Sequence, residues 1–203
     1  LAIGLGIAAS LGAVVETLIQ QIHYPDFYKK ITGAATEVRR AAFRELIEKA
    51  LPAYAVLMLF TVSLAPHLTR LLVAPSYFEV AKFVALGAFV EFFRMASGVV
   101  SAAAHSEMRT RTLIVPYAAG GLAVLAGVYL FGPSGARDTL IPAALIAGAG
   151  LTFFILRAEI ARAMSFDFKL SVLARPVLFA APLAGFLAVP AGASAAFSAL
   201  MAF

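Results

Sequence analysis

The chain has 203 residues, of which 62% are hydrophobic and only 13% are charged, well below the roughly 25% charged residues of soluble proteins. Its net charge of +5 comes mostly from lysines and arginines between apolar runs, so the charge does not indicate nucleic-acid binding. The absence of cysteine excludes disulfides and cysteine-bound metals. The composition excludes a soluble domain. It predicts an all-α, polytopic transmembrane helix bundle, because barrel strands would alternate apolar and polar residues.

The apolar runs predict about six full spans and a truncated seventh, since a helix needs about 20 apolar residues to cross a bilayer. They cover residues 1–22, 50–73, 79–104, 113–131, 139–156, 170–189 and 192–203. The chain begins and ends inside apolar runs. We therefore expect residues 1–203 to form a single transmembrane bundle from a longer protein.

The first span carries small residues at four-residue spacing, Gly4, Ala8 and Gly12. Such a stripe lets a second helix approach closely, so we expect this span to pack against a neighbour. Glu16 lies toward the far end of the span, where an interfacial position is favoured over a role in a site.

A basic connection, residues 26–49, follows the first span, and its apolar positions recur every three to four residues. Its remaining face carries Lys29, Lys30, Arg39, Arg40 and Arg44. This pattern predicts an amphipathic cytoplasmic helix that lies on the membrane surface and contacts membrane lipids. A simple basic loop would explain the charges as well.

The third span, residues 79–104, carries an acid and a base near its midpoint, Glu91 and Arg94. A charge at the centre of a membrane helix costs at least ~2.5 kcal/mol, so this pair needs a reason. Their i, i+3 spacing puts both side chains on one helix face. Two interpretations are open: a substrate-binding site that lines a polar cavity, and a buried structural pair that fixes helix packing. Glu79 and Lys82 are expected to be a solvated interfacial pair.

Lysine and arginine are distributed unequally over the two sides of the predicted bundle. The side that follows the first, third and fifth spans holds Lys29, Lys30, Arg39, Arg40, Arg44, Lys49, Arg109, Arg111, Arg157, Arg162, Lys169 and Arg175. The opposite side has only Arg70, Lys82 and Arg137. By the positive-inside rule, the first side faces the cytoplasm and the first span enters from outside.

The sequence lacks the motifs of several enzyme classes. The three histidines, His23, His67 and His105, fall at predicted interfaces on different connections, without a partner at metal-ligand spacing. No Walker A motif, dinucleotide fingerprint or Gly-x-Ser-x-Gly motif occurs. We therefore expect no enzyme activity, no cofactor and no metal, and Glu91 and Arg94 are the one constellation with chemical content.

The order of features resembles a family of transporters. The motif YPDFYK at residues 24–29, the basic connection, the proline-marked second span and the motif LLVAPSYFEVA at residues 71–81 resemble the C-terminal half of polysaccharide exporters. These are the O-antigen flippase-like proteins of the multidrug/oligosaccharidyl-lipid/polysaccharide superfamily. The turn GPSGA at residues 132–136 is similar to the family's turn between its eleventh and twelfth helices. The resemblance covers nearly the whole chain.

The resemblance implies one bundle of a two-bundle transporter that works by alternating access around a central cavity. The six spans would be the family's eighth to thirteenth helices. The implied function is a flippase for a lipid-linked oligosaccharide or polysaccharide precursor, as in lipopolysaccharide biosynthesis, in the bacterial inner membrane. The implied partners are the lipid-linked glycan, membrane lipids and the missing N-terminal bundle of the same protein. No family motif transfers a substrate-binding role to Glu91 or Arg94.

Arg94 suits a polyprenyl-pyrophosphate-linked glycan, because a guanidinium binds phosphate through two parallel hydrogen bonds. Two alternatives are open. In a cation-coupled exporter of small amphipathic compounds, Glu91 would carry the proton or sodium ion. A membrane-embedded glycan or lipid transferase is the other, and the lack of an acidic metal motif or nucleophile in the connections argues against it.

Overall fold

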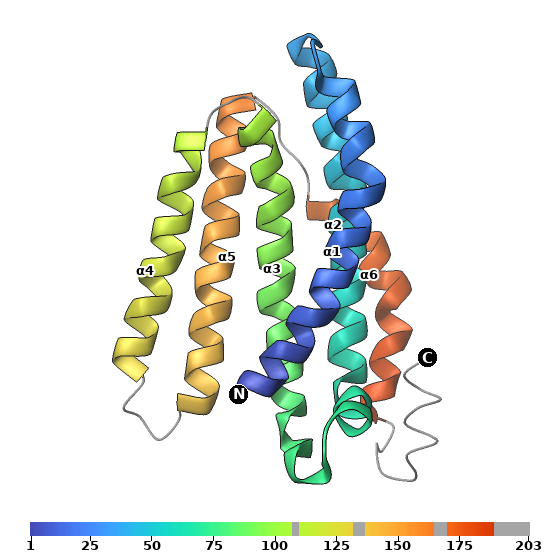
Figure 1. Cartoon of the computed structure of the whole chain (residues 1–203), viewed down its shortest axis with the longest axis vertical. Helices are drawn as coiled ribbons and strands as arrows, with labels where there is room; N and C mark the ends of the chain where they lie inside the picture. The colour runs from blue at the N-terminus through green and yellow to red at the C-terminus, as the bar shows by residue number, and fades with distance from the viewer. Residues whose placement is uncertain (107–109, 132–136, 165–169, 189–203) are drawn as a thin grey trace.

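The computed structural model describes residues 1–106, 110–131, 137–164 and 170–188. These residues are organised in helices, and no strand occurs among them. Within the described ranges, five helices are long and apolar enough to cross a membrane: Ala2–Ile31, Thr36–Leu72, Pro75–Ser106, Thr110–Phe131 and Asp138–Ala163. The expected all-α architecture is confirmed, with helices of transmembrane length that run side by side (Figure 1).

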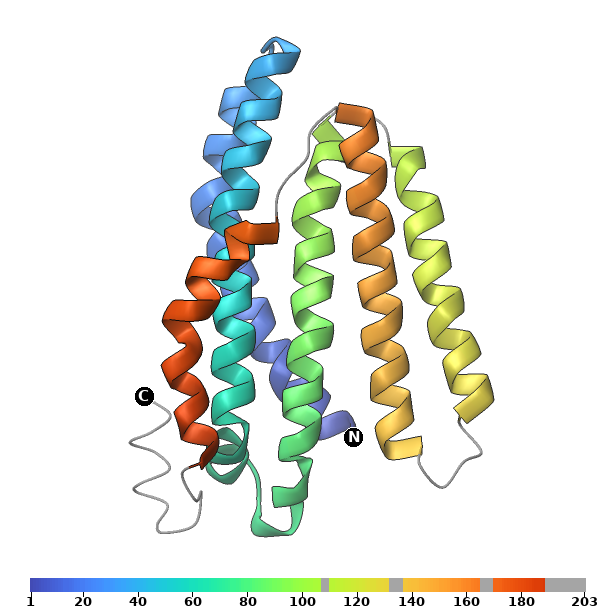
Figure 2. The same ribbon diagram turned by 180° about the vertical axis from the view of Figure 1, so that it is seen from behind.

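The helices are joined by short connections. In chain order they are α1 (Ala2–Ile31), α2 (Thr36–Leu72), η1 (Pro75–Val80), α3 (Ala81–Ser106), η2 (Thr110–Leu113), α4 (Ile114–Phe131), α5 (Arg137–Met164), η3 (Leu170–Leu173), α6 (Ala174–Ala180) and η4 (Ala181–Ala188), where η denotes a 3₁₀ helix. Figures 1 and 2 show α3 at the centre, with α1 and α2 on one side and α5 on the other. Helix α4 packs mainly on α5, and α6 lies against α2.

The expected sixth span, residues 170–189, is divided into η3, α6 and η4. Its apolar helical stretch, Ser171–Leu183, falls in the class of 10–17 residues, too short for a full span. Pro182 has no N–H group with which to continue the α-helical hydrogen bonding beyond Ala180. Six full spans are therefore not confirmed, and the partial seventh, residues 192–203, lies outside the described residues.

The expected amphipathic helix over residues 26–49 is not present as a separate surface element. The segment is divided between the end of α1 and the start of α2, which form an antiparallel hairpin around a turn at residues 32–35. Gly33 takes the left-handed conformation of this turn, with φ +68°. Because α2 has 37 residues and is about 55 Å long, its charged first part, together with the end of α1, extends beyond α3, α4 and α5 (Figure 1).

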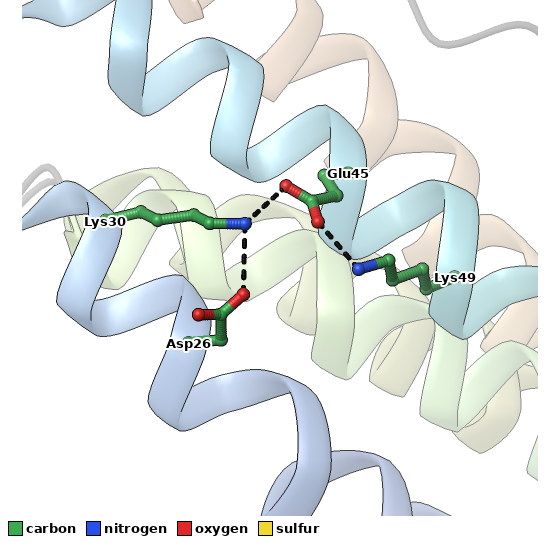
Figure 3. Close-up of polar contacts among 4 residues, drawn as sticks. All are labelled: Asp26, Lys30, Glu45 and Lys49. Carbon is green, nitrogen blue, oxygen red and sulfur yellow. Dashed lines mark hydrogen bonds and ion pairs between the residues drawn. The ribbon is translucent and has the colours of Figure 1, made fainter.

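The apolar stripe of this segment packs between helices, and its charges join the two arms. Phe27, Ala42 and Leu46 of this stripe are buried in the main apolar core, whereas Val38 is 50% exposed. In Figure 3, Lys30 lies between Glu45 at 2.7 Å and Asp26 at 3.0 Å, while Lys49 contacts the other oxygen of Glu45 at 2.6 Å. The period of 3.6 residues thus predicts the helical face correctly, and the buried part of that face packs on protein.

The hairpin network should contribute a small, salt-sensitive part of the stability, because its groups are exposed. We expect Glu45→Gln to lower the melting temperature in detergent by about 2 °C at low salt, and the difference to disappear near 1 M salt. Glu48→Gln is the matched control, since Glu48 forms no ion pair with any described residue. An equal decrease in both variants would show that net charge, not the network, causes the change.

The small-residue stripe of α1 packs on α3, as the sequence predicts. Gly4, Ala8 and Gly12 are all buried. A Cβ atom added at Gly4 would lie 2.6 Å from the Cβ atom of Phe83, and one added at Gly87 would lie 2.8 Å from the Cβ atom of Ala8. This close approach of the α1 and α3 backbones is possible only because these side chains are so small.

Candidate functional site

Arg94 lies in the middle of α3 and contacts two carboxylates. Its Nε atom donates a hydrogen bond to Oε2 of Glu91, one turn earlier on the same helix, at 2.7 Å. Its Nη2 atom donates to Oε2 of Glu16 on α1, also at 2.7 Å. The structure thus pairs Glu91 with Arg94, as their spacing predicts, and adds Glu16, which the sequence had favoured as an interfacial residue.

Two glycines make room for the carboxylates in the seam between α1 and α3. A Cβ atom added at Gly12 would lie 3.0 Å from Oε2 of Glu91, and one added at Gly98 would lie 3.6 Å from Oε1 of Glu16. Glu16 continues the four-residue spacing of the small-residue stripe, and that stripe was the signal that could have pointed to it. Glu16 and Arg94 are 78 positions apart in the sequence, so no local motif indicates their contact.

The three side chains differ in exposure. Glu91 is 13% exposed, Glu16 is 20% exposed and Arg94 is 47% exposed. The guanidinium therefore reaches out of the packed seam while its carboxylate partners remain largely inside it. Contact of this charge with lipid at mid-span would cost several kcal/mol. Water, a ligand or another protein segment must therefore cover this face.

A cleft of about 450 Å³ opens beside Arg94, a size typical of small-molecule sites. Side chains or backbone of α1, α3, α4 and α5 line it. Its polar and aromatic lining consists of Glu16, Arg94, Ser97, Tyr117 and Thr152. The cleft thus combines one cation, one carboxylate, two hydroxyls and one phenol on otherwise apolar helices.

Ser97 supplies an unsatisfied donor to this cleft. Its side chain is only 2% exposed, and its hydroxyl has no hydrogen-bond partner among the described residues. A buried polar group without a partner costs about 1–3 kcal/mol. The hydroxyl of Thr152, by contrast, donates to the carbonyl oxygen of Gly148 at 3.0 Å. The Ser97 hydroxyl therefore lies buried in the wall of the cleft without a partner among the described residues.

Glycines of α4 and α5 form the far wall of the cleft. A Cβ atom added at Gly148 would lie 2.8 Å from the carbonyl oxygen of Gly120, and one added at Gly120 would lie 2.7 Å from that of Gly148. The two backbones are thus in direct contact. Gly121 also lines the cleft, but an added Cβ atom there would meet nothing within 4 Å.

Two other expectations differ from the structure. Glu79 and Lys82 form no ion pair among the described residues, and the Lys82 Nζ atom lies 5.0 Å from the centre of the Phe83 ring. His67, expected at an interface, is fully buried. Glu79, Lys82 and His67 do not line the cleft.

The arrangement around Arg94 can bind an anion. A guanidinium has five N–H donors, and two of them are used by Glu16 and Glu91. The other three have no acceptor among the described residues.

Comparison with known proteins gives no match: no family model, no curated protein and no solved structure matches the chain. The function is therefore inferred from the chemistry of the cleft.

Proposed function

We propose that this chain forms one bundle of a two-bundle transporter in the bacterial inner membrane, and that the transporter flips a lipid-linked oligosaccharide or polysaccharide precursor by alternating access. The observation that carries the proposal is the half-exposed guanidinium of Arg94 at the wall of the cleft. Its unused donors suit the oxygens of a diphosphate. The resemblance of the sequence to polysaccharide exporters supports the same function.

The surroundings of the cleft suit an amphipathic substrate. Helix α4, which forms part of the wall, exposes Leu122, Leu125 and Tyr129 on its outer side. A polyprenyl tail can remain against such apolar surface in the bilayer while the diphosphate and sugars occupy the polar cleft. A second bundle of the same protein would cover the exposed side of Arg94 and complete the path, because alternating access of this type moves one bundle against another.

Ligand binding tests this proposal on the protein in detergent. We expect farnesyl diphosphate to bind at least about tenfold more tightly than farnesol, because both ligands carry the same tail and only the first carries an anion. The affinity for the diphosphate should fall as salt rises. Isothermal titration calorimetry would measure both ligands. Equal affinities, or no binding of the diphosphate, would contradict the proposed function.

A second candidate function is supported by the number of carboxylates. Glu16 and Glu91 share one arginine, so two negative charges and one positive charge leave one excess negative charge when all three are ionised. Such an excess negative charge inside a membrane bundle favours binding of a monovalent cation. This would suit a cation-coupled exporter of small amphipathic compounds. Tighter binding of tetraphenylphosphonium than of farnesyl diphosphate in the same titrations would favour this candidate.

A further inference from the structure

We propose that Glu16 competes with the anionic group of the substrate for Arg94, whereas Glu91 is a positioning residue that stays bound. The proposal rests on the anion binding proposed above. Both carboxylates contact the guanidinium at 2.7 Å, but they do so through different nitrogen atoms and from different helices. This difference gives the two glutamates opposite effects on ligand binding.

The geometry of a guanidinium decides which carboxylate is in the way. Only two of its edges can donate a pair of parallel hydrogen bonds, Nε with Nη2 and Nη1 with Nη2. The Nη2 atom belongs to both edges, and Glu16 is bonded to it. The Nε atom belongs to one edge only, and Glu91 is bonded to it. Nη2 carries two N–H groups, so an anion on the Nη1–Nη2 edge can leave Glu91 in place, but one of its oxygens then accepts from the same nitrogen as the Glu16 carboxylate, and the two negative charges repel each other.

The positions of the two carboxylates lead to the same assignment. Glu16 lines the cleft beside Arg94, whereas Glu91 is absent from that lining and lies against Gly12 in the α1–α3 seam. Beside Glu16, α3 presents Gly98, where no side chain blocks a movement of the carboxylate. Glu16 therefore has room to swing away from Arg94, and Glu91 is held between two packed helices.

Displacement of Glu16 would also change the contact between α1 and α3. Among the described residues, the Arg94–Glu16 bond is the ion pair that joins these two helices. When an anion takes its place, the apolar small-residue stripe is left to hold them together. Binding of the substrate would thereby release α1 from α3 at the level of the cleft, which couples occupancy to helix movement.

Two variants separate competition from a general effect of charge. Glu16→Gln and Glu91→Gln each remove one negative charge that contacts Arg94. We expect Glu16→Gln to bind farnesyl diphosphate about tenfold more tightly than the unmodified protein, since the anion no longer meets a negative charge at the nitrogen that it shares with residue 16. We expect Glu91→Gln not to bind more tightly, because Arg94 loses its anchor. Equal tightening in both variants would overturn the proposal, and so would weaker binding by Glu16→Gln.

Glu16→Asp provides a second test if the glutamine variant is not recovered in folded form. It keeps the charge but withdraws the carboxylate by one methylene, so we expect tightening between that of Glu16→Gln and none. No tightening would overturn the competition. If neither the unmodified protein nor any Glu16 variant binds the diphosphate, the anion site itself fails. Diphosphate binding that Glu16 variants do not strengthen leaves that site standing and removes only the competition.

Discussion

We expect Arg94→Gln to bind farnesyl diphosphate at least about a hundredfold more weakly than the unmodified protein, because two charge-assisted hydrogen bonds to the anion would be lost together. Arg94→Lys should recover only part of the affinity, since an ammonium group cannot present a planar two-donor edge. Calorimetric titration measures both variants. Arg70→Gln is the matched control: Arg70 lies near the end of α2, above the Phe78 ring, and its loss removes the same charge away from the cleft.

The same substitution also separates the two interpretations of the charged pair. Without Arg94, Glu16 and Glu91 face each other without a cation, and we expect a loss of stability on the order of 2 kcal/mol. This is less than for a fully buried pair, because Arg94 is half exposed. The triple variant Glu16→Gln, Glu91→Gln, Arg94→Gln should recover most of the stability and none of the diphosphate binding. A stable triple variant that still binds the diphosphate would exclude Arg94 as its ligand.

Gly148→Leu should produce the largest loss of stability from any single glycine substitution in α5. An added Cβ atom would lie 2.8 Å from a backbone oxygen of α4, so the two helices must separate, at a cost of about 3 kcal/mol. Chemical unfolding in detergent would measure the change. The cleft loses its far wall in this variant, so ligand binding should fall as well.

Gly121→Leu is the matched control on the facing helix. Nothing lies within 4 Å of an added Cβ atom at this position, so the stability should not decrease. The new side chain would project into the cleft, however, and farnesyl diphosphate should bind less tightly. If Gly121→Leu and Gly148→Leu destabilise the protein equally, the contact between α4 and α5 is not as close as the structure shows it.

The sequence was sufficient for contacts that depend on local spacing. The pairing of Glu91 with Arg94 follows from one helical turn, and the burial of Gly4 follows from the small-residue stripe. The contact of Glu16 with Arg94 depends on where α1 crosses α3, and no pattern within either helix states this. The role of neighbouring glycines is equally non-local: Gly120 contacts backbone and Gly121 faces open space.

The hairpin and the last helices show a different limit of sequence patterns. An apolar stripe with helical period indicates that one face is covered but not by what, so Phe27 and Leu46 could be assigned to lipid or to protein. Composition likewise counts apolar residues without recording where a helix is interrupted. Residues 170–189 are apolar enough for a span, yet the α-helix within them ends at Ala180.

The continuity of α1 makes the projecting hairpin a lever. One uninterrupted helix carries Gly12 in the close seam with α3, Glu16 beside the cleft and Lys30 in the hairpin. From Gly12 to Ile31 the helix rises about 28 Å, so a rotation of about 10° at the seam would move the tip by roughly 5 Å. Because Phe27 of the first arm and Phe43 of the second are buried in the same apolar core, both arms would move together. A fluorophore attached at the tip of the hairpin would therefore report a small helix movement near Arg94 as a displacement of several ångströms.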